Sequence, residues 1–218
     1  MKTDEKAQPP IAAVFFDFGG VICNDPFRVM AAVASSSGFE MAEFASIAVG
    51  YGDYGDGDHP WHRLERGEIE VAAYEQAVVT MARERGHDGF PPLPVDLILS
   101  QVLVVRPEMM ELLGDLRAQG VATAILTNNV RALGAWRDTA DWDQLVDAVI
   151  DSCEVGMRKP EHRMFNHACE LLGVSPAQAA FLDDMQANVD AAAEVGLSTV
   201  LVADPTDAIA TLRELIER

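Results

Sequence analysis

Four short polar segments lie at or just beyond the ends of apolar runs. In chain order they are Phe15-Phe16-Asp17-Phe18-Gly19-Gly20, Ile125-Leu126-Thr127-Asn128-Asn129, Gly156-Met157-Arg158-Lys159-Pro160 and Phe181-Leu182-Asp183-Asp184. Together they supply a carboxylate, a hydroxyl, an amine and a second carboxylate, groups that suit covalent attack or the binding of a hard cation. Each segment alone is also typical of a turn or a helix cap. The prediction of chemistry therefore depends on their meeting in one place.

Five apolar runs predict the strands that would bring these segments together. Continuous hydrophobic runs of this length are typical of strands buried on both faces of a parallel sheet. The predicted strands are Ile11–Phe16, Ala122–Leu126, Asp147–Ile150, Ala179–Leu182 and Ser198–Val202. Helices are expected over Pro107–Gly120, Glu161–Leu172, Gln186–Val195 and Thr206–Arg218. This alternation predicts an α/β fold with a doubly wound, parallel five-stranded sheet of Rossmann-like topology.

The stretch from 24 to 104 interrupts that alternation and is too long for a crossover connection. Its helical patterns cover Phe27–Ser36, Met41–Val49, Ile69–Arg85 and Val95–Leu103, with a Gly/Asp-rich loop at Gly50–Asp58. Ligands of open α/β sheets bind at the carboxyl ends of the strands, where this insert would leave the core. We therefore predict a core domain formed by 1–23 and 105–218, and a helical cap domain formed by 24–104.

In this order and context the four polar segments resemble the motifs of the haloacid-dehalogenase-like (HAD) hydrolase superfamily, and the resemblance covers the chain from about Ile11 onward. Within that superfamily the chain looks most like the branch of α-D-glucose-1-phosphate phosphatases and of the N-terminal phosphatase domain of soluble epoxide hydrolases. The segments Glu65-Arg66-Gly67-Glu68-Ile69 and Val105-Arg106-Pro107-Glu108 also read like that branch. The resemblance implies a magnesium-dependent phosphatase that acts on a small phosphate monoester such as a sugar phosphate.

The resemblance also implies a role for each matching residue. Asp17 would be the nucleophile that attacks phosphorus and forms an aspartyl-phosphate, which water then hydrolyses. Thr127 and Asn128 would bind the phosphoryl oxygens, where positioning and electrostatics supply most of the catalysis. Lys159 would hold both the phosphoryl group and the Asp17 carboxylate with its compact positive charge.

The implied metal site for Mg²⁺ combines Asp17, the main-chain carbonyl of Gly19 and Asp184. Magnesium prefers a few oxygen ligands from the protein and retains several waters. Asp183 and Asn188 would then lie outside the ligand set and support it.

One position departs from the pattern of many phosphatases in the family. They carry a second aspartate two residues after the nucleophile, which protonates the leaving group and activates water, whereas this chain has Gly19. General acid-base catalysis contributes on the order of 10²–10⁴-fold, so turnover of substrates with poor leaving groups should suffer. Glycine also occurs here in glucose-1-phosphate phosphatase-like members, and Asp25 is a conceivable substitute donor.

Two further sets of residues lie outside the four motifs, and the first has competing interpretations. The cap side chains His59, Trp61, His62 and Arg66 follow the Gly/Asp-rich loop, and they either reach the substrate or pack within the cap. Arg106 is expected at the hinge where the chain re-enters the core.

Two other functions remain open at the level of the sequence. An L-2-haloacid dehalogenase also uses an aspartate nucleophile without a second aspartate but needs no metal, and the Asp183-Asp184 pair argues against it. A catalytically silent regulatory or binding protein that keeps the fold is supported by Gly19 alone. A receiver domain of two-component signalling is excluded because its motif order differs and it has no cap.

The composition and charge of the chain indicate which partners and which cellular compartment to expect. A net charge of -19 would repel nucleic acid, so we do not expect a nucleic-acid partner. A small phosphorylated substrate is the partner that the family resemblance implies. The three cysteines show neither a disulfide framework nor zinc-ligand spacing, and no apolar run approaches the roughly 18 residues of a membrane span. The polar stretch Met1–Pro10 lacks the apolar segment of a signal peptide. These features predict a cytoplasmic protein without membrane partners, and they leave its oligomeric state open.

Overall fold

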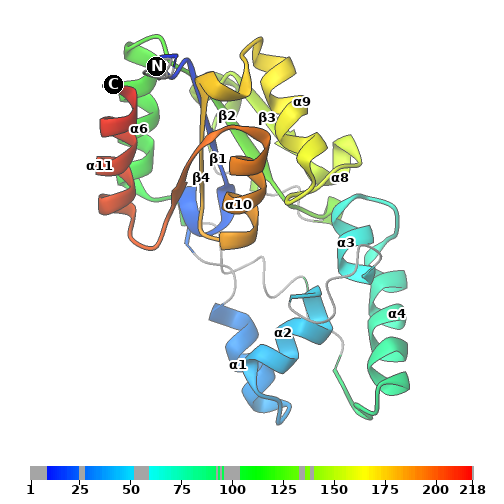
Figure 1. Ribbon diagram of the computed structural model, residues 1–218. Helices are drawn as coiled ribbons and strands as arrows, with labels where there is room; N and C mark the ends of the chain where they lie inside the picture. Colours follow the sequence, from blue (N-terminus) through cyan, green and yellow to red (C-terminus); the bar gives the residue numbers. More distant parts are fainter. Residues whose placement is uncertain are drawn as a thin grey trace, which may run out of the picture.

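The computed structural model describes residues 9–24, 28–51, 59–91, 93, 95, 104–132, 136–137 and 140–217, and shows an α/β core with a group of helices below one edge of its sheet (Figure 1). The strands are β1 (Ala13–Phe16), β2 (Ala122–Thr127), β3 (Ala148–Asp151), β4 (Ala179–Asp183) and β5 (Ser198–Leu201). They form one parallel sheet in the order β3-β2-β1-β4-β5. The predicted fold class is confirmed, with strand boundaries shifted by at most two residues.

Helices cover both faces of this sheet because alternate strand residues are buried on opposite sides. On one face, Val14 and Phe16 pack with α6 (Pro107–Ala118) and α11 (Pro205–Ile216). On the other, Ala13 and Phe15 pack with α9 (His162–Leu172) and α10 (Gln186–Val195), and Figure 1 shows the two helix pairs on opposite sides. The strands are therefore buried on both faces, as their continuous apolar runs predict.

The cap helices pack around a hydrophobic cluster of their own. They are α1 (Arg28–Ser36), α2 (Met41–Val49), α3 (Pro60–Glu65) and α4 (Val71–Glu84). Fully buried side chains of this cluster include Phe44, Ile47, Tyr74 and Val78. Apart from Val95, the helix predicted at Val95–Leu103 lies outside the described residues, as does the loop predicted at Gly50–Asp58 apart from Gly50 and Tyr51.

Two chain segments connect the cap to the core side by side. Cys23 and Val105 form an isolated antiparallel bridge, and the Asn24 N–H donates to the Val104 carbonyl at 3.3 Å. This pairing supports the proposed division into a core of 1–23 with 105–218 and a cap of 24–104. Among the described helices, none has the length and apolar character needed to cross a membrane.

Candidate active site

The carboxyl edge of the sheet brings the predicted acidic and hydroxyl residues together. Asp17 directly follows β1, Thr127 ends β2 and Asp183 ends β4. Phe16 is in register with Ile125 on one side and with Leu182 on the other, and the Asp17 N–H donates to the Leu182 carbonyl at 2.9 Å. The parallel register therefore places these side chains on one edge of three neighbouring strands.

Lys159 joins two of the carboxylates from its position beyond α8 (Ser152–Val155). Its Nζ lies 2.7 Å from Asp17 Oδ1 and 2.7 Å from Asp183 Oδ2, and its side chain is 1% exposed. Burial lowers the pKa of Lys159, but the two carboxylates raise it by more, so the net pKa lies above its ordinary value. The site therefore favours the positively charged form of the amine.

Asp17 is a carboxylate in a crowded acidic environment. Its Oδ1 accepts the Phe18 N–H at 2.6 Å as well as the lysine amine. Burial raises the pKa of Asp17 well above its usual value, Lys159 opposes that shift, and Asp183 and Asp184 add to it. Since negative charge is disfavoured here, a further cation would stabilise the ionised carboxylate that attack on a substrate requires.

Asp183 has its hydrogen-bonding capacity taken up within the protein. Oδ1 accepts the Met185 N–H at 2.8 Å, the Asn188 amide lies 3.0 and 3.1 Å from the two oxygens, and Lys159 binds Oδ2. The side chain is fully buried. Asp183 therefore orients Lys159, and Asn188 orients Asp183, an arrangement that suits the supporting roles predicted for both.

Asp184, by contrast, is partly exposed and lies against the turn that follows Asp17. A Cβ placed on Gly20 would come within 2.0 Å of Asp184 Oδ2, and Gly20 has a φ of 79°. Glycine at position 20 is required for both reasons. Gly19 has φ −72° and ψ 130°, an ordinary extended conformation, so Gly20 rather than Gly19 needs the backbone freedom of glycine.

The donors of this site fit a magnesium ion. One carboxylate oxygen each from Asp17, Asp183 and Asp184 lies within 4.8 Å of the others. Because Asp183 is committed to Lys159 and Asn188, the oxygens best suited to a metal are those of Asp17 and Asp184. These three carboxylates and the Lys159 ammonium together carry a net charge of -2 when all are ionised, which favours a divalent cation.

Asn128 holds the segment that carries Lys159. Its Oδ1 accepts the Lys159 N–H at 2.8 Å, and its Nδ2 donates to the Lys159 carbonyl at 2.8 Å. The predicted contact of Asn128 with substrate would use the second N–H of the same amide. The neighbouring Asn129 is fixed in turn by Asp151 and Ser152 at 2.9 and 2.8 Å, so the loop after β2 is preorganised.

Arg106 connects the hinge to the turn after the nucleophile. Its guanidinium donates to the Gly20 carbonyl at 3.1 Å and to the Cys23 carbonyl at 3.3 Å. It is also the residue from which α6 begins. The structure thus places Arg106 at the hinge, as the sequence predicts.

The cap residues whose role the sequence left open make most of their contacts with other cap residues. His59 caps the start of α3: its ring accepts the Trp61 N–H at 3.1 Å and contacts the Ile47 carbonyl at 3.0 Å. Trp61 packs edge-on against Tyr74, with 5.4 Å between the ring centroids. His59 and His62 are both buried. Packing is therefore the interpretation that the geometry of these residues favours.

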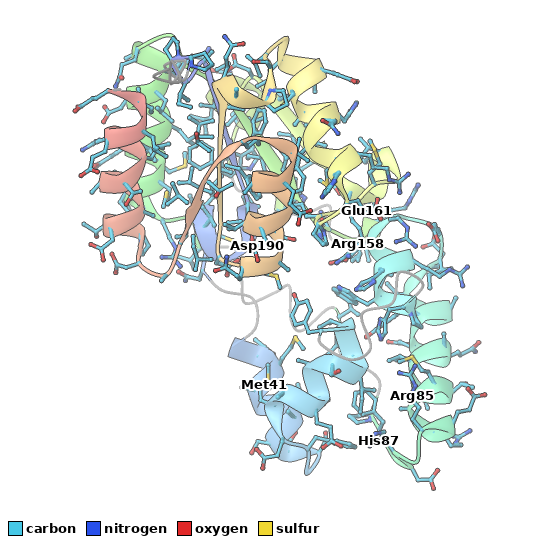
Figure 2. The ribbon with its side chains drawn as sticks, viewed as in Figure 1. Met41, Arg85, His87, Arg158, Glu161 and Asp190 are labelled. Atoms are coloured by element: carbon cyan, nitrogen blue, oxygen red, sulfur yellow. The ribbon has the colours of Figure 1, made fainter. Side chains whose placement is uncertain are left out.

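Among the residues that the structure describes, two ion pairs join the cap to the core. Arg158 Nε lies 2.6 Å from Glu65 Oε2, with side chains only 10% and 7% exposed, and Arg66 contacts Glu161 at 3.3 Å. A Cβ on Gly67 would lie 2.5 Å from the Cys153 carbonyl, which shows how closely the backbones approach. Figure 2 labels Arg158 and Glu161 where the core meets α3. Both segments belong to the family motifs, but their contact was not predictable from the sequence.

Tyr51 is a second residue at the contact between cap and core that the sequence does not predict. It follows α2 in the cap, and its hydroxyl donates to Met185 Sδ at 3.2 Å, directly beyond the Asp183-Asp184 pair. Its only signal in the sequence was an aromatic residue at the start of a Gly/Asp-rich loop. Asp25, the substitute donor considered from the sequence, lies outside the described residues.

Comparison with known families agrees with this geometry. A haloacid dehalogenase-like hydrolase family model matches residues 11–196. The chain therefore belongs to the haloacid dehalogenase-like hydrolases, which confirms the resemblance seen in its motifs and makes it a hydrolase.

Curated relatives include both large proteins and a phosphatase of similar size. The chain is 30% identical to mouse acyl-CoA dehydrogenase family member 10 and 28% identical to mouse bifunctional epoxide hydrolase 2, over 94% and 72% of its length. It spans only 19% and 30% of those proteins. It is also 30% identical to the sesquiterpene phosphatase astK of Aspergillus oryzae, over 72% of this chain and 79% of that protein.

Solved structures support the fold. A HAD family enzyme of Bacteroides thetaiotaomicron, in complex with magnesium and inorganic phosphate, superposes with a TM-score of 0.60 at 22% identity, over 88% of this chain and 93% of that one. A dehalogenase superposes with a TM-score of 0.62 at 19% identity, over 99% of both chains.

Proposed function

We propose that this hydrolase is a magnesium-dependent phosphatase that acts on a small phosphate monoester through an aspartyl-phosphate on Asp17. The observation that carries the proposal is the shared lysine: Lys159 Nζ lies 2.7 Å from both Asp17 and Asp183, while Asp184 completes an acidic cluster. This arrangement suits a doubly charged phosphoryl group accompanied by a divalent cation.

In the proposed reaction, an Asp17 carboxylate oxygen forms a bond to phosphorus as the ester oxygen departs with its bonding electrons. Lys159 holds Asp17 in place and offsets charge on the phosphoryl oxygens. The Thr127 hydroxyl, at the end of the neighbouring strand, binds a phosphoryl oxygen together with Asn128. Water then attacks the acyl-phosphate, releases inorganic phosphate and restores the Asp17 carboxylate.

The metal would be held by Asp17, the Gly19 carbonyl and Asp184, and when bound it would neutralise phosphate charge. Fully buried Asp183 serves to keep Lys159 and the loop at Met185 in position. The similarity to the Aspergillus oryzae phosphatase supports phosphate ester hydrolysis, and the bound magnesium and phosphate named for the Bacteroides enzyme support the cofactor.

The test is a screen of phosphate monoesters for release of inorganic phosphate, with magnesium and with EDTA. We expect activity with magnesium, loss with EDTA and recovery on adding magnesium back. Chloride release from 2-chloropropionate is followed in parallel. Full phosphatase activity in EDTA would refute the metal assignment, and chloride release without phosphatase activity would identify a dehalogenase.

The Asp184→Asn variant tests the ligand directly. We expect its apparent affinity for magnesium, measured by titration calorimetry, to fall by at least about tenfold, since even residues outside the ligand set contribute roughly 10–100-fold. The matched control is Asp190→Asn, because Asp190 is an exposed carboxylate on α10 that accepts a hydrogen bond from Gln186, one turn earlier, at 2.7 Å (Figure 2). Equal magnesium affinity in both variants would exclude Asp184 as a ligand.

A further inference from the structure

Tyr51 brings a hydroxyl from the cap to the acidic loop of the core. The residue follows Gly50, whose φ of 76° ends α2 and turns the chain. The phenol donates to Met185 Sδ at 3.2 Å, and the Met185 N–H is itself bonded to Asp183 at 2.8 Å. Tyr51 therefore contacts the residue that directly follows the proposed metal ligand Asp184.

The surrounding contacts fix the cap at this distance from the core. Glu65, in α3, accepts Arg158 at 2.6 Å and also the Trp61 side chain. Burial raises the pKa of Tyr51, the Glu65 carboxylate raises it further, Arg158 opposes the shift, and Asp184 and Asp17 contribute as well. Burial thus acts with the Asp184 and Asp17 carboxylates to raise the pKa of the phenol, which stays protonated.

A thioether is a weak hydrogen-bond acceptor. The hydrogen bond from Tyr51 to Met185 is therefore one that a stronger acceptor can replace at little cost. An ester oxygen that leaves phosphorus with its bonding electrons is such an acceptor, because negative charge develops on it. At position 19, where many family phosphatases have an acid, this chain has no side chain to serve that oxygen.

We propose that Tyr51 is a catalytic residue of the cap, whose hydroxyl donates a hydrogen bond to the leaving-group oxygen of the phosphate ester. The inference rests on the proposed phosphatase function. As the Asp17 oxygen bonds to phosphorus, the ester P–O bond breaks and its electron pair goes to the leaving oxygen. The phenol stabilises that oxygen and keeps its own proton, and water protonates the alcohol product.

The test compares Tyr51→Phe with wild type on monoesters of graded leaving-group pKa, by single-turnover measurement at saturating magnesium. We expect the variant to lose about 10- to 100-fold on alkyl phosphates, as for a hydrogen bond to a charged oxygen, and under about threefold on p-nitrophenyl phosphate, whose leaving group needs little help. The slope of rate against leaving-group pKa therefore steepens. A packing defect would instead lower all rates alike.

The matched control is Tyr74→Phe, which removes another buried cap hydroxyl, one that donates to the Ala48 carbonyl at 2.9 Å. We expect it to lower stability without changing the slope. Gly19→Asp supplies the missing acid at a φ of −72° that aspartate adopts readily, and it should flatten the slope and shrink the effect of Tyr51→Phe in the double variant.

The outcomes separate the two proposals. If wild type hydrolyses no phosphate ester, the proposed function fails. If wild type is active and Tyr51→Phe keeps its slope, or matches Tyr74→Phe across the series, the role of Tyr51 is refuted while the phosphatase proposal stands.

Discussion

At the scale of single residues, the site separates two adjacent carboxylates into different roles. Asp183 is fully buried and bound by Lys159, Asn188 and the Met185 N–H, whereas Asp184 is partly exposed beside Gly20. A carboxylate whose lone pairs are already used cannot readily gain a metal ion. The acidic pair thus supplies one residue that orients the lysine and one that is suited to magnesium.

Replacement of the proposed nucleophile should lower activity without lowering thermal stability. Asp17→Asn should reduce phosphatase turnover on the order of 10⁴-fold or more, as expected for loss of a covalent nucleophile. Burial raises the pKa of Asp17 well above its usual value, which means that its negative charge is disfavoured in the fold. At pH 7 without metal, we therefore expect the variant to melt at the same temperature as wild type or higher.

Turnover and thermal unfolding in EDTA check both parts of this prediction, with Asp190→Asn as the control. Mass spectrometry of wild type quenched during turnover should locate a phosphate adduct on the peptide that contains Asp17. Undiminished turnover in Asp17→Asn, or an adduct on another peptide, would contradict the assignment.

Site residues that directly follow strands were predictable from the strand pattern and Lys159 from its motif, whereas the contacts between cap and core were not. Asp17, Thr127 and Asp184 follow or end apolar runs, so strand prediction alone places them at one edge of the sheet. Tyr51 and Glu65 contact residues across the interface between cap and core. The hydrophobic periodicity of the sequence predicts helices and strands, but it does not predict which distant residues these side chains contact. Their sites depend on tertiary packing between segments distant in the chain.

At the scale of elements, the long helices and buried strands were predicted closely, and the short ones were missed. Met41–Val49 and Gln186–Val195 match the expected bounds, because each has an apolar face and ends at a glycine with positive φ. The helix α3 is only six residues long, too short to show a helical period. Its start depends on His59 as a cap, which is not among the preferred capping residues.

Burial of His59 predicts that the stability of the cap decreases at acidic pH. Burial lowers the pKa of His59 to about 4 and that of His62 to about 3, against an ordinary value of 6.5. Below pH 6.5 the unfolded chain gains protons that the folded chain does not. The free energy of unfolding should therefore fall as the pH drops from 6.5 toward 4. Protonation of His59 would also place a hydrogen on Nδ1, which now accepts the Trp61 N–H.

Urea denaturation at several pH values between 7 and 5 measures this dependence. His59→Asn keeps a capping side chain but removes the titrating group, so the slope of stability against pH should decrease relative to wild type. The control is His162→Gln, since the His162 side chain is 53% exposed. An identical slope in wild type and His59→Asn would show that His59 does not contribute.

At the scale of the whole molecule, one buried ion pair joins the cap to the segment that carries the catalytic lysine. Arg158 directly precedes Lys159, and its partner Glu65 comes from α3. Burial raises the pKa of Glu65 even though Arg158 lowers it, so desolvation outweighs pairing. Such a pair adds little net stability, but either member left alone is an uncompensated buried charge. Its main effect is to specify how the cap docks.

This energetics predicts opposite results for single and double replacements. Glu65→Met should lower the free energy of unfolding by about 3–5 kcal/mol because it leaves Arg158 unpaired in a buried site. Glu65→Met combined with Arg158→Met should recover most of that loss, since apolar side chains of similar volume remove both charges together. Denaturant titration of the variants gives the coupling energy.

Arg213→Met is the matched control, because its pair with Asp115 is exposed and should contribute less than about 1 kcal/mol. If the double variant retains stability but loses phosphatase turnover, the ion pair is needed to hold the cap over the site. If the double variant is as unstable as Glu65→Met, the unpaired charge of Arg158 does not cause the loss of stability.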